Sequence, residues 1–303
     1  MATDTLPGER AHVRRATVIG GVAILLWSTL ALLTTLSGSI PPFQLVAMSF
    51  VLAFLVGTAA AVARGRSVVA PLRQPWPVWL LGVGGLFGYH FFYFLAFRLA
   101  PEAAVEVNLL NYLWPLLIVL FSALLPGERL RRGHVLGGLL GLAGTALLVT
   151  GKGRGLSIEA AYLPGYLSAA ACAVVWSGYS VLSRRFGYVP TEAVGGFCLA
   201  TAVLAALCHV VFEATVLPGA TEWLAVLLLG IGPVGAAFFV WDHGVKRGDI
   251  RALGALSYAT PLLSTFLLIL FDRAEAGWIV WAACALIVGG AVLASWDVLR
   301  GRR

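Results

Sequence analysis

Long apolar runs recur along almost the whole chain, separated by short breaks rich in proline, glycine and charged residues. Each run holds about 20 residues, the length that a helix needs to cross roughly 30 Å of hydrocarbon. A barrel strand would be about half as long and would alternate apolar with polar residues. The pattern therefore predicts an all-α polytopic membrane protein with ten transmembrane helices. The predicted spans are residues 16–36, 42–63, 76–97, 102–125, 134–151, 163–183, 190–212, 222–244, 252–271 and 277–298.

The overall composition supports a membrane protein. Of 303 residues, 60% are hydrophobic and 12% are charged, and the mean hydropathy is +0.91. This leaves too little polar surface to cover a soluble globule. The first apolar run is longer than the core of about 7–15 residues found in cleaved signal peptides, so we expect it to remain as the first helix.

The placement of Lys and Arg predicts the orientation, because these residues are retained on the cytoplasmic side. With both termini cytoplasmic, 17 of the 21 basic residues fall in inner segments. The net charge of +7 thus reflects topology, and we expect no nucleic-acid partner. The inner residues are Arg10, Arg14, Arg15, Arg64, Arg66, Arg73, Arg129, Arg131, Arg132, Arg184, Arg185, Lys246, Arg247, Arg251, Arg300, Arg302 and Arg303; the outer ones are Arg98, Lys152, Arg154 and Arg273.

The chain contains a repeated motif. Tyr112–Leu117 reads YLWPLL and Tyr258–Leu263 reads YATPLL, 146 residues later. A Trp-Ser pair precedes each copy, at positions 27–28 and 176–177, and a glycine follows each copy, at positions 144 and 290. We expect two repeats, residues 1–151 and 152–303. Five spans per repeat is an odd number, so the repeats would be inverted, with a substrate site between them near the midplane and transport by alternating access.

This arrangement resembles the EamA-type branch of the drug/metabolite transporter superfamily, over residues 16–298. Within that branch, Gly88-Tyr89-His90 and the segment 108–115 (NLLNYLWP) resemble the bacterial aromatic amino acid exporters. The resemblance implies ten helices in two halves and export of aromatic amino acids.

The fourth and ninth spans carry the main candidates for substrate binding. Pro115 and Pro261 each remove a backbone donor and free a carbonyl near Asn111 and Ser257. In one interpretation, Asn108, Asn111 and Ser257 join these carbonyls to hold the charged groups of a zwitterion. In the other, the prolines only bend the helices and the amides pair across helices.

Aromatic residues inside the spans favour a cavity suited to flat rings. We expect the substrate to contact these residues: Trp27, Tyr89, His90, Tyr93, Tyr112, Trp114, Trp176, Tyr179, Trp241 and Tyr258.

Three ionisable residues within the spans are candidates for proton coupling: His90, Glu106 and Asp242. His90 lies well inside the third span, where it would either bind substrate and protons or donate one structural hydrogen bond. Glu106 and Asp242 lie near water interfaces, where a solvated or paired carboxylate is the alternative.

Missing features narrow the substrate. No Lys or Arg lies in the middle of a span, which disfavours phosphorylated substrates. No carboxylate lies in the first span, which disfavours quaternary cations. The four cysteines lack metal-binding spacing, and we expect no cofactor and no metal; the oligomeric state stays open.

These observations predict a transporter of the inner membrane, not an enzyme, that exports aromatic and other hydrophobic amino acids. The alternative is an exporter of another neutral or zwitterionic metabolite or drug. An intramembrane hydrolase is a remote alternative, because no Gly-x-Ser-x-Gly motif occurs in the chain.

Overall fold

The computed structural model describes residues 7–126, 130–150, 159–271 and 277–299. Within these ranges the secondary structure is helical and contains no strand. The α-helices are α1 (Pro7–Ser28), α2 (Leu30–Leu36), α3 (Pro42–Ala63), α4 (Trp76–Leu99), α5 (Ala104–Asn111), α6 (Trp114–Ser122), α7 (Arg132–Thr150), α8 (Leu163–Leu182), α9 (Ala193–Phe212), α10 (Ala220–Ile231), α11 (Ala237–Arg247), α12 (Ile250–Leu256), α13 (Ala259–Leu270) and α14 (Trp278–Leu299). Short 3₁₀ segments are η1 (Ala70–Leu72), η2 (Pro101–Ala103), η3 (Ala160–Tyr162) and η4 (Ser183–Phe186), and η5 (Gly232–Ala236) is a π-helix.

Nine helical runs among the described residues are long and apolar enough to cross a membrane. They coincide with the first nine predicted spans, with ends shifted by a few residues. The tenth predicted span lies on α14, where the qualifying apolar stretch, Trp278–Ala294, is shorter. The prediction of a helical, multi-pass membrane protein is confirmed.

Four of the spans are broken near their middle. The α5–α6 and α12–α13 spans break just before the motif prolines, because Pro115 and Pro261 cannot donate to the preceding turn. The α10–α11 span contains the π-helix η5, with Pro233 at its second position. In the α1–α2 span, the Ser28 and Thr29 hydroxyls donate to the carbonyls of Leu25 and Leu26, which bends the helix.

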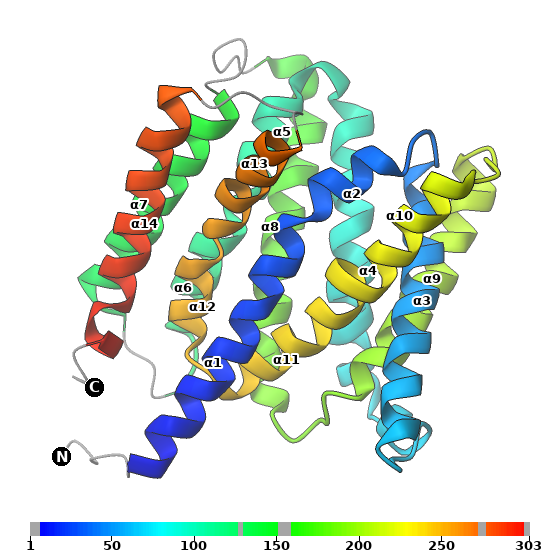
Figure 1. Cartoon of the computed structure of the whole chain (residues 1–303), viewed down its shortest axis with the longest axis horizontal. Helices are drawn as coiled ribbons and strands as arrows, with labels where there is room; N and C mark the ends of the chain where they lie inside the picture. The colour runs from blue at the N-terminus through cyan, green and yellow to red at the C-terminus, as the bar shows by residue number, and fades with distance from the viewer. Residues whose placement is uncertain (1–6, 127–129, 151–158, 272–276, 300–303) are drawn as a thin grey trace.

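The helices pack in a pattern that is unchanged when the two halves of the chain are exchanged. α1 packs on α11, α4 on α8, α3 on α9 and α7 on α14, as Figure 1 shows. In span order these are pairs 1–8, 3–6, 2–7 and 5–10. If each span in one half is exchanged for the corresponding span in the other half, five places away, pair 1–8 becomes pair 6–3. Pairs 2–7 and 5–10 are exchanged onto themselves.

The close contacts between α7 and α14 are also preserved when corresponding positions of the two halves are exchanged. A Cβ built on Gly137 would lie 2.5 Å from the Gly290 carbonyl oxygen, and one on Gly144 would lie 3.0 Å from that of Ala283. Positions 137 and 283 are 146 residues apart, as are positions 144 and 290. Glycine is required here because the two backbones touch.

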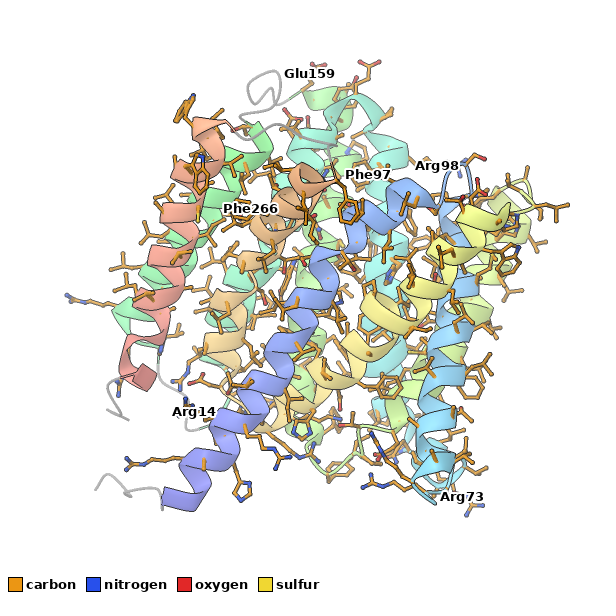
Figure 2. All side chains as sticks on the ribbon, viewed as in Figure 1. Arg14, Arg73, Phe97, Arg98, Glu159 and Phe266 are labelled. Carbon is orange, nitrogen blue, oxygen red and sulfur yellow. The ribbon has the colours of Figure 1, made fainter. Side chains whose placement is uncertain are left out.

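The first and last helices define the two ends of the molecule. α1 begins and α14 ends at the same end, which we call the proximal end; the opposite end is the distal end (Figure 1). Arg14 and Arg73 lie at the proximal end, whereas Arg98 and Glu159 lie at the distal end (Figure 2). Several basic residues used for the predicted orientation lie outside the described residues: Arg129, Lys152, Arg154, Arg273, Arg300, Arg302 and Arg303.

Candidate functional site

Four tryptophans from four different spans meet at the centre of the bundle. Trp27 on α1, Trp114 on α6, Trp176 on α8 and Trp241 on α11 form a cluster in which every pair of rings is in contact. The centroid distances run from 5.0 Å for Trp27 and Trp241 to 6.4 Å for Trp114 and Trp176. None of the four is more than 7% exposed. We call these residues the tryptophan cluster.

Hydrogen bonds fix the cluster to the broken helices. The Trp27 Nε1 donates to the carbonyl oxygen of Pro233, within the π-helix, at 3.0 Å. The Trp241 Nε1 donates to the Ser180 hydroxyl at 3.1 Å. The Ser177 hydroxyl donates to the carbonyl oxygen of Trp114 at 2.9 Å. The break in the α10–α11 span therefore supplies the acceptor that orients the Trp27 ring.

Two phenylalanines that the sequence interpretation missed complete this aromatic core. Phe238 contacts Trp27, Trp176 and His90 and stacks on Phe50, with ring centroids 5.6 Å apart. Phe50 is fully buried and meets the His90 ring edge-on at 5.1 Å. The repeat could have identified Phe238, because it lies 148 positions after His90, the same interval that separates Gly82 from Gly230.

A row of rings leads from the tryptophan cluster toward the distal end along one face of α4. Tyr89 contacts Trp176 at 5.5 Å and stacks on Tyr93 at 6.0 Å. Tyr93 contacts Phe97 at 5.0 Å, and Phe97 lies in the distal half of the bundle (Figure 2). The spacing of four residues places these side chains on the same helix face.

The asparagines of α5 pair with these tyrosines. The Asn111 Nδ2 donates to the Tyr89 hydroxyl, and the Tyr93 hydroxyl donates to the Asn108 Oδ1, both at 3.3 Å. Asn108 also donates to the carbonyl oxygen of Ala104, and the Cys172 thiol donates to the Asn111 Oδ1. We call Tyr89, Tyr93, Asn108 and Asn111 the tyrosine–asparagine tier. It places amides and hydroxyls directly distal to the tryptophan cluster.

His90 lies beside this tier with one ring nitrogen engaged. Its Nδ1 donates to the carbonyl oxygen of Leu86 at 2.7 Å. Its Nε2 takes no part in this hydrogen bond. The rings of Phe50, Tyr89, Phe94 and Phe238 surround it. The imidazole is therefore oriented by its own helix and faces an aromatic environment.

Deeply buried apolar side chains lie just proximal to the tryptophan cluster. On the proximal side, Val181, Val189, Val245, Ile250 and Leu253 are at most 3% exposed. On the distal side, the predicted site residues His90, Tyr93, Asn108 and Tyr112 are half-buried. The residues just proximal to the tryptophan cluster are therefore more deeply buried than these four site residues.

Other predicted residues lie apart from this centre. Tyr258 is fully buried in a second cluster with Leu116, Leu262 and Ile287, in the space that Gly141 leaves open. The Ser257 hydroxyl donates to the Leu253 carbonyl oxygen. The Ser257 carbonyl, which Pro261 was expected to free, accepts from the Thr260 N–H at 3.0 Å.

Other predicted residues adjoin the centre. Tyr179 packs on Trp176, one turn nearer the proximal end, and Pro115 follows Trp114 in the first turn of α6.

Asp242 is held in a buried ion pair just proximal to Trp241. Its carboxylate lies 2.8 Å from the Lys246 Nζ and accepts from the Thr191 hydroxyl at 2.7 Å. The Lys246 Nζ also donates to the Val189 carbonyl oxygen. Glu106, by contrast, is half-buried in the first turn of α5 at the distal end.

The chain is similar to known transporters over most of its length. The model of the EamA-like transporter family matches twice, at residues 16–150 and 163–296. A protein of Ancylobacter novellus named aromatic amino acid exporter YddG is 61% identical over 280 residues, covering 92% of this chain and 96% of that protein. Proteins of the same name from Salmonella typhimurium and Escherichia coli strain K12 are each 27% identical, covering 95% of this chain and 99% of their own length.

One solved structure, described as "Crystal structure of protein", aligns with a TM-score of 0.91 at 60% identity, covering 96% of this chain and 99% of that one. The expected resemblance is therefore confirmed, and the chain is a transporter and not an enzyme. It belongs to the EamA-like transporter family.

Proposed function

We propose that this protein exports aromatic and other hydrophobic amino acids. The observation that carries the proposal is the tryptophan cluster, four indole rings from four spans that are buried against one another inside a membrane bundle. The three relatives named as aromatic amino acid exporters support the same substrate class.

The two neighbouring groups of residues suit the two parts of such a substrate. An aromatic side chain would pack against the tryptophan cluster, where edge-to-face ring contacts contribute about 0.5–1.5 kcal/mol each beyond burial. The charged ammonium and carboxylate would meet the amides and hydroxyls of the tyrosine–asparagine tier and the free Nε2 of His90. In this proposal Tyr258, Ser257 and Pro261 shape the ninth span and do not contact the substrate.

We propose further that the two halves, residues 1–151 and 152–303, form an inverted repeat that alternates access to this site. The double match of the family model supports the division. The exchange of helix pairs, and of the glycine contacts between α7 and α14, supports a two-fold relation between the halves. The deep burial of the residues just proximal to the tryptophan cluster suits a state that is closed on the proximal side.

We propose that the proximal end faces the cytoplasm and that the protein lies in the inner membrane. The excess of basic residues at this end supports the orientation. Arg14 and Arg73 lie there, with Lys246 and Arg247 at the last turn of α11.

The three candidates for proton coupling differ in their surroundings. His90 adjoins the tyrosine–asparagine tier, so we propose that it contacts the substrate. Asp242 is paired with Lys246 on the proximal side, where it would close the bundle until the pair separates. Glu106 lies at the distal entrance and has other interactions.

A panel of ligands tests the substrate class directly. A ligand that binds only the folded state raises apparent stability, by about 2.7 kcal/mol at a hundredfold excess over its Kd. We expect tryptophan, phenylalanine and tyrosine to raise the melting temperature of the purified protein more than leucine, and aspartate or lysine to leave it unchanged. If neutral drugs raise it and no amino acid does, the protein is an exporter of the alternative substrate class.

A further inference from the structure

A groove of about 890 Å³ lies at the proximal end, between the first turns of α1 and the last turn of α11. Its lining shares no residue with the tryptophan cluster. Its lining combines four nitrogen-bearing side chains, His12, Arg15, His243 and Arg247, with the apolar side chains of Val13 and Ile19. The transport mechanism proposed above uses none of these residues.

The groove is a region of positive charge. Arg15 and Arg247 are exposed, and the Arg247 Nη1 lies 3.3 Å from the His243 Nδ1. The charges of both arginines act on the His243 ring, so both guanidinium groups lie near it. Two guanidinium groups that converge on one groove offer the geometry that binds a phosphate group.

The proximal carboxylates whose contacts are described are engaged elsewhere. Asp242 pairs with Lys246, and Asp249 caps α12 and contacts Arg251. Glu192 pairs with Arg66. Partial burial acts to raise the pKa of Glu192, but its hydrogen bonds and the Arg66 charge outweigh burial and lower that pKa below its ordinary value. These groups leave the charge of the groove available to an anion from outside the chain.

The shape of the groove is set by tight packing behind it. A Cβ on Gly20 would lie 2.8 Å from the Gly244 Cα, so α1 and α11 touch backbone to backbone. The Asp249 N–H donates to the Thr17 hydroxyl at 2.8 Å, which ties the start of α12 to the same turn of α1. The groove is therefore formed before any ligand binds.

An apolar strip leads from the groove toward the middle of the membrane. Val18, Val22 and Leu25 lie three to four residues apart on α1 and are 65%, 40% and 57% exposed. Together with Val13 and Ile19, they give a ligand with acyl chains a surface that continues from its headgroup. Free phosphate has no group that would use this surface.

We propose that the groove binds the headgroup of an anionic glycerophospholipid, with its phosphate between Arg15 and Arg247 and its acyl chains along α1. Basic pockets between transmembrane helices at the membrane surface have the chemistry for such headgroups. The bound lipid would join α1 to α11 at the end where these two helices already touch.

Native mass spectrometry of the full chain, released from membranes of equal phosphatidylglycerol and phosphatidylcholine, tests this proposal. We expect one phosphatidylglycerol to be retained preferentially. Removing both charges in Arg15→Gln/Arg247→Gln should lower that preference about 30-fold, since each basic residue near an anionic headgroup contributes about a factor of five. Wild-type preference in this double variant would overturn the proposal.

Control variants separate the groove from general surface charge and from misfolding. Arg73→Gln removes one charge at the same end of the molecule and should keep the preference (Figure 2). Arg15→Lys/Arg247→Lys keeps both charges and should retain most of the preference for phosphatidylglycerol. If this variant loses the preference as completely as the glutamine variant, the loss reflects misfolding and contradicts recognition by charge. Equal thermal protection by inorganic phosphate and by phosphatidylglycerol would show that the site takes free anions and would also contradict the lipid assignment.

Discussion

The tryptophan cluster places unusual demands on single residues. Trp27 contacts the other three indoles. Its Nε1–H donates to the carbonyl oxygen of Pro233, which the π-helix makes available. A buried indole that leaves its N–H unpaired would cost about 1–3 kcal/mol, so the π-helix and the cluster depend on each other.

A conservative change at this position tests the role of the cluster in transport. Trp27→Phe keeps an aromatic ring but loses the hydrogen bond and part of the ring contact, about 1–3 kcal/mol together, so we expect a phenylalanine exchange rate about tenfold or more below wild type. Trp278→Phe, at a position 72% exposed, should leave the rate unchanged. Both rates are measured in liposomes with matched protein content. Equal rates for Trp27→Phe and wild type would show that the tryptophan cluster is not part of the substrate site.

The buried pair of Asp242 and Lys246 should matter for stability. Both side chains are at most 3% exposed, and removing one partner of a buried pair leaves an uncompensated charge, which costs about 3–5 kcal/mol. Asp242→Asn should therefore lower the free energy of unfolding strongly. Glu192→Gln, which breaks the pair with the largely exposed Arg66, should cost at most about 1 kcal/mol.

The double variant Asp242→Asn/Lys246→Met should recover most of the loss, because no charge remains buried. Chemical unfolding in detergent measures all three. If Asp242→Asn is no more destabilising than Glu192→Gln, the pair does not hold the proximal side closed.

At the scale of helices, contact between backbones replaces interlocking side chains at α7 and α14. A Cβ on Gly290 would lie 2.6 Å from the Gly137 carbonyl oxygen, whereas one on Gly289 meets nothing within 4 Å. Gly290→Ala should therefore destabilise the protein by about 1–3 kcal/mol through overpacking. Gly289→Ala should be neutral or stabilising by up to about 1 kcal/mol. A similar loss of unfolding free energy in both variants would contradict the proposed role of the backbone contact at Gly290.

The spans could be predicted from the sequence because the membrane fixes their length and their apolar character. The prolines at 115 and 261 also indicated where two spans break. The breaks in α1–α2 and α10–α11 were not predicted: one arises from hydroxyls that bond backward to carbonyls, and the other from a π-helix around Pro233.

The candidate site was predictable where residues stood out from their span. Four tryptophans and the amides of α5 are rare in apolar helices and were identified. Phe50 and Phe238 were missed because a phenylalanine in an apolar helix has no polarity contrast. Tyr258 matches Tyr112 in the motif but occupies a different environment, since Gly141 leaves room for its ring against α7.

At the scale of the whole molecule, the main helix pairs and the tryptophan cluster lie between the two halves of the chain. Each of the pairs α1–α11 and α4–α8 joins one half to the other, and the tryptophan cluster takes two rings from each half. Separation of the halves on the proximal side would break the Trp27–Trp241 and Trp114–Trp176 contacts together. Substrate binding and closure would then involve the same rings.

Exchange of radiolabelled phenylalanine across liposomes that contain only the purified protein tests the central proposal most directly. We predict saturable exchange that unlabelled tryptophan and tyrosine compete for, that aspartate and lysine do not, and that Trp27→Phe slows about tenfold while Trp278→Phe does not. A folded wild-type protein that exchanges no aromatic amino acid, or exchange that every variant of the tryptophan cluster leaves unchanged, would contradict the account.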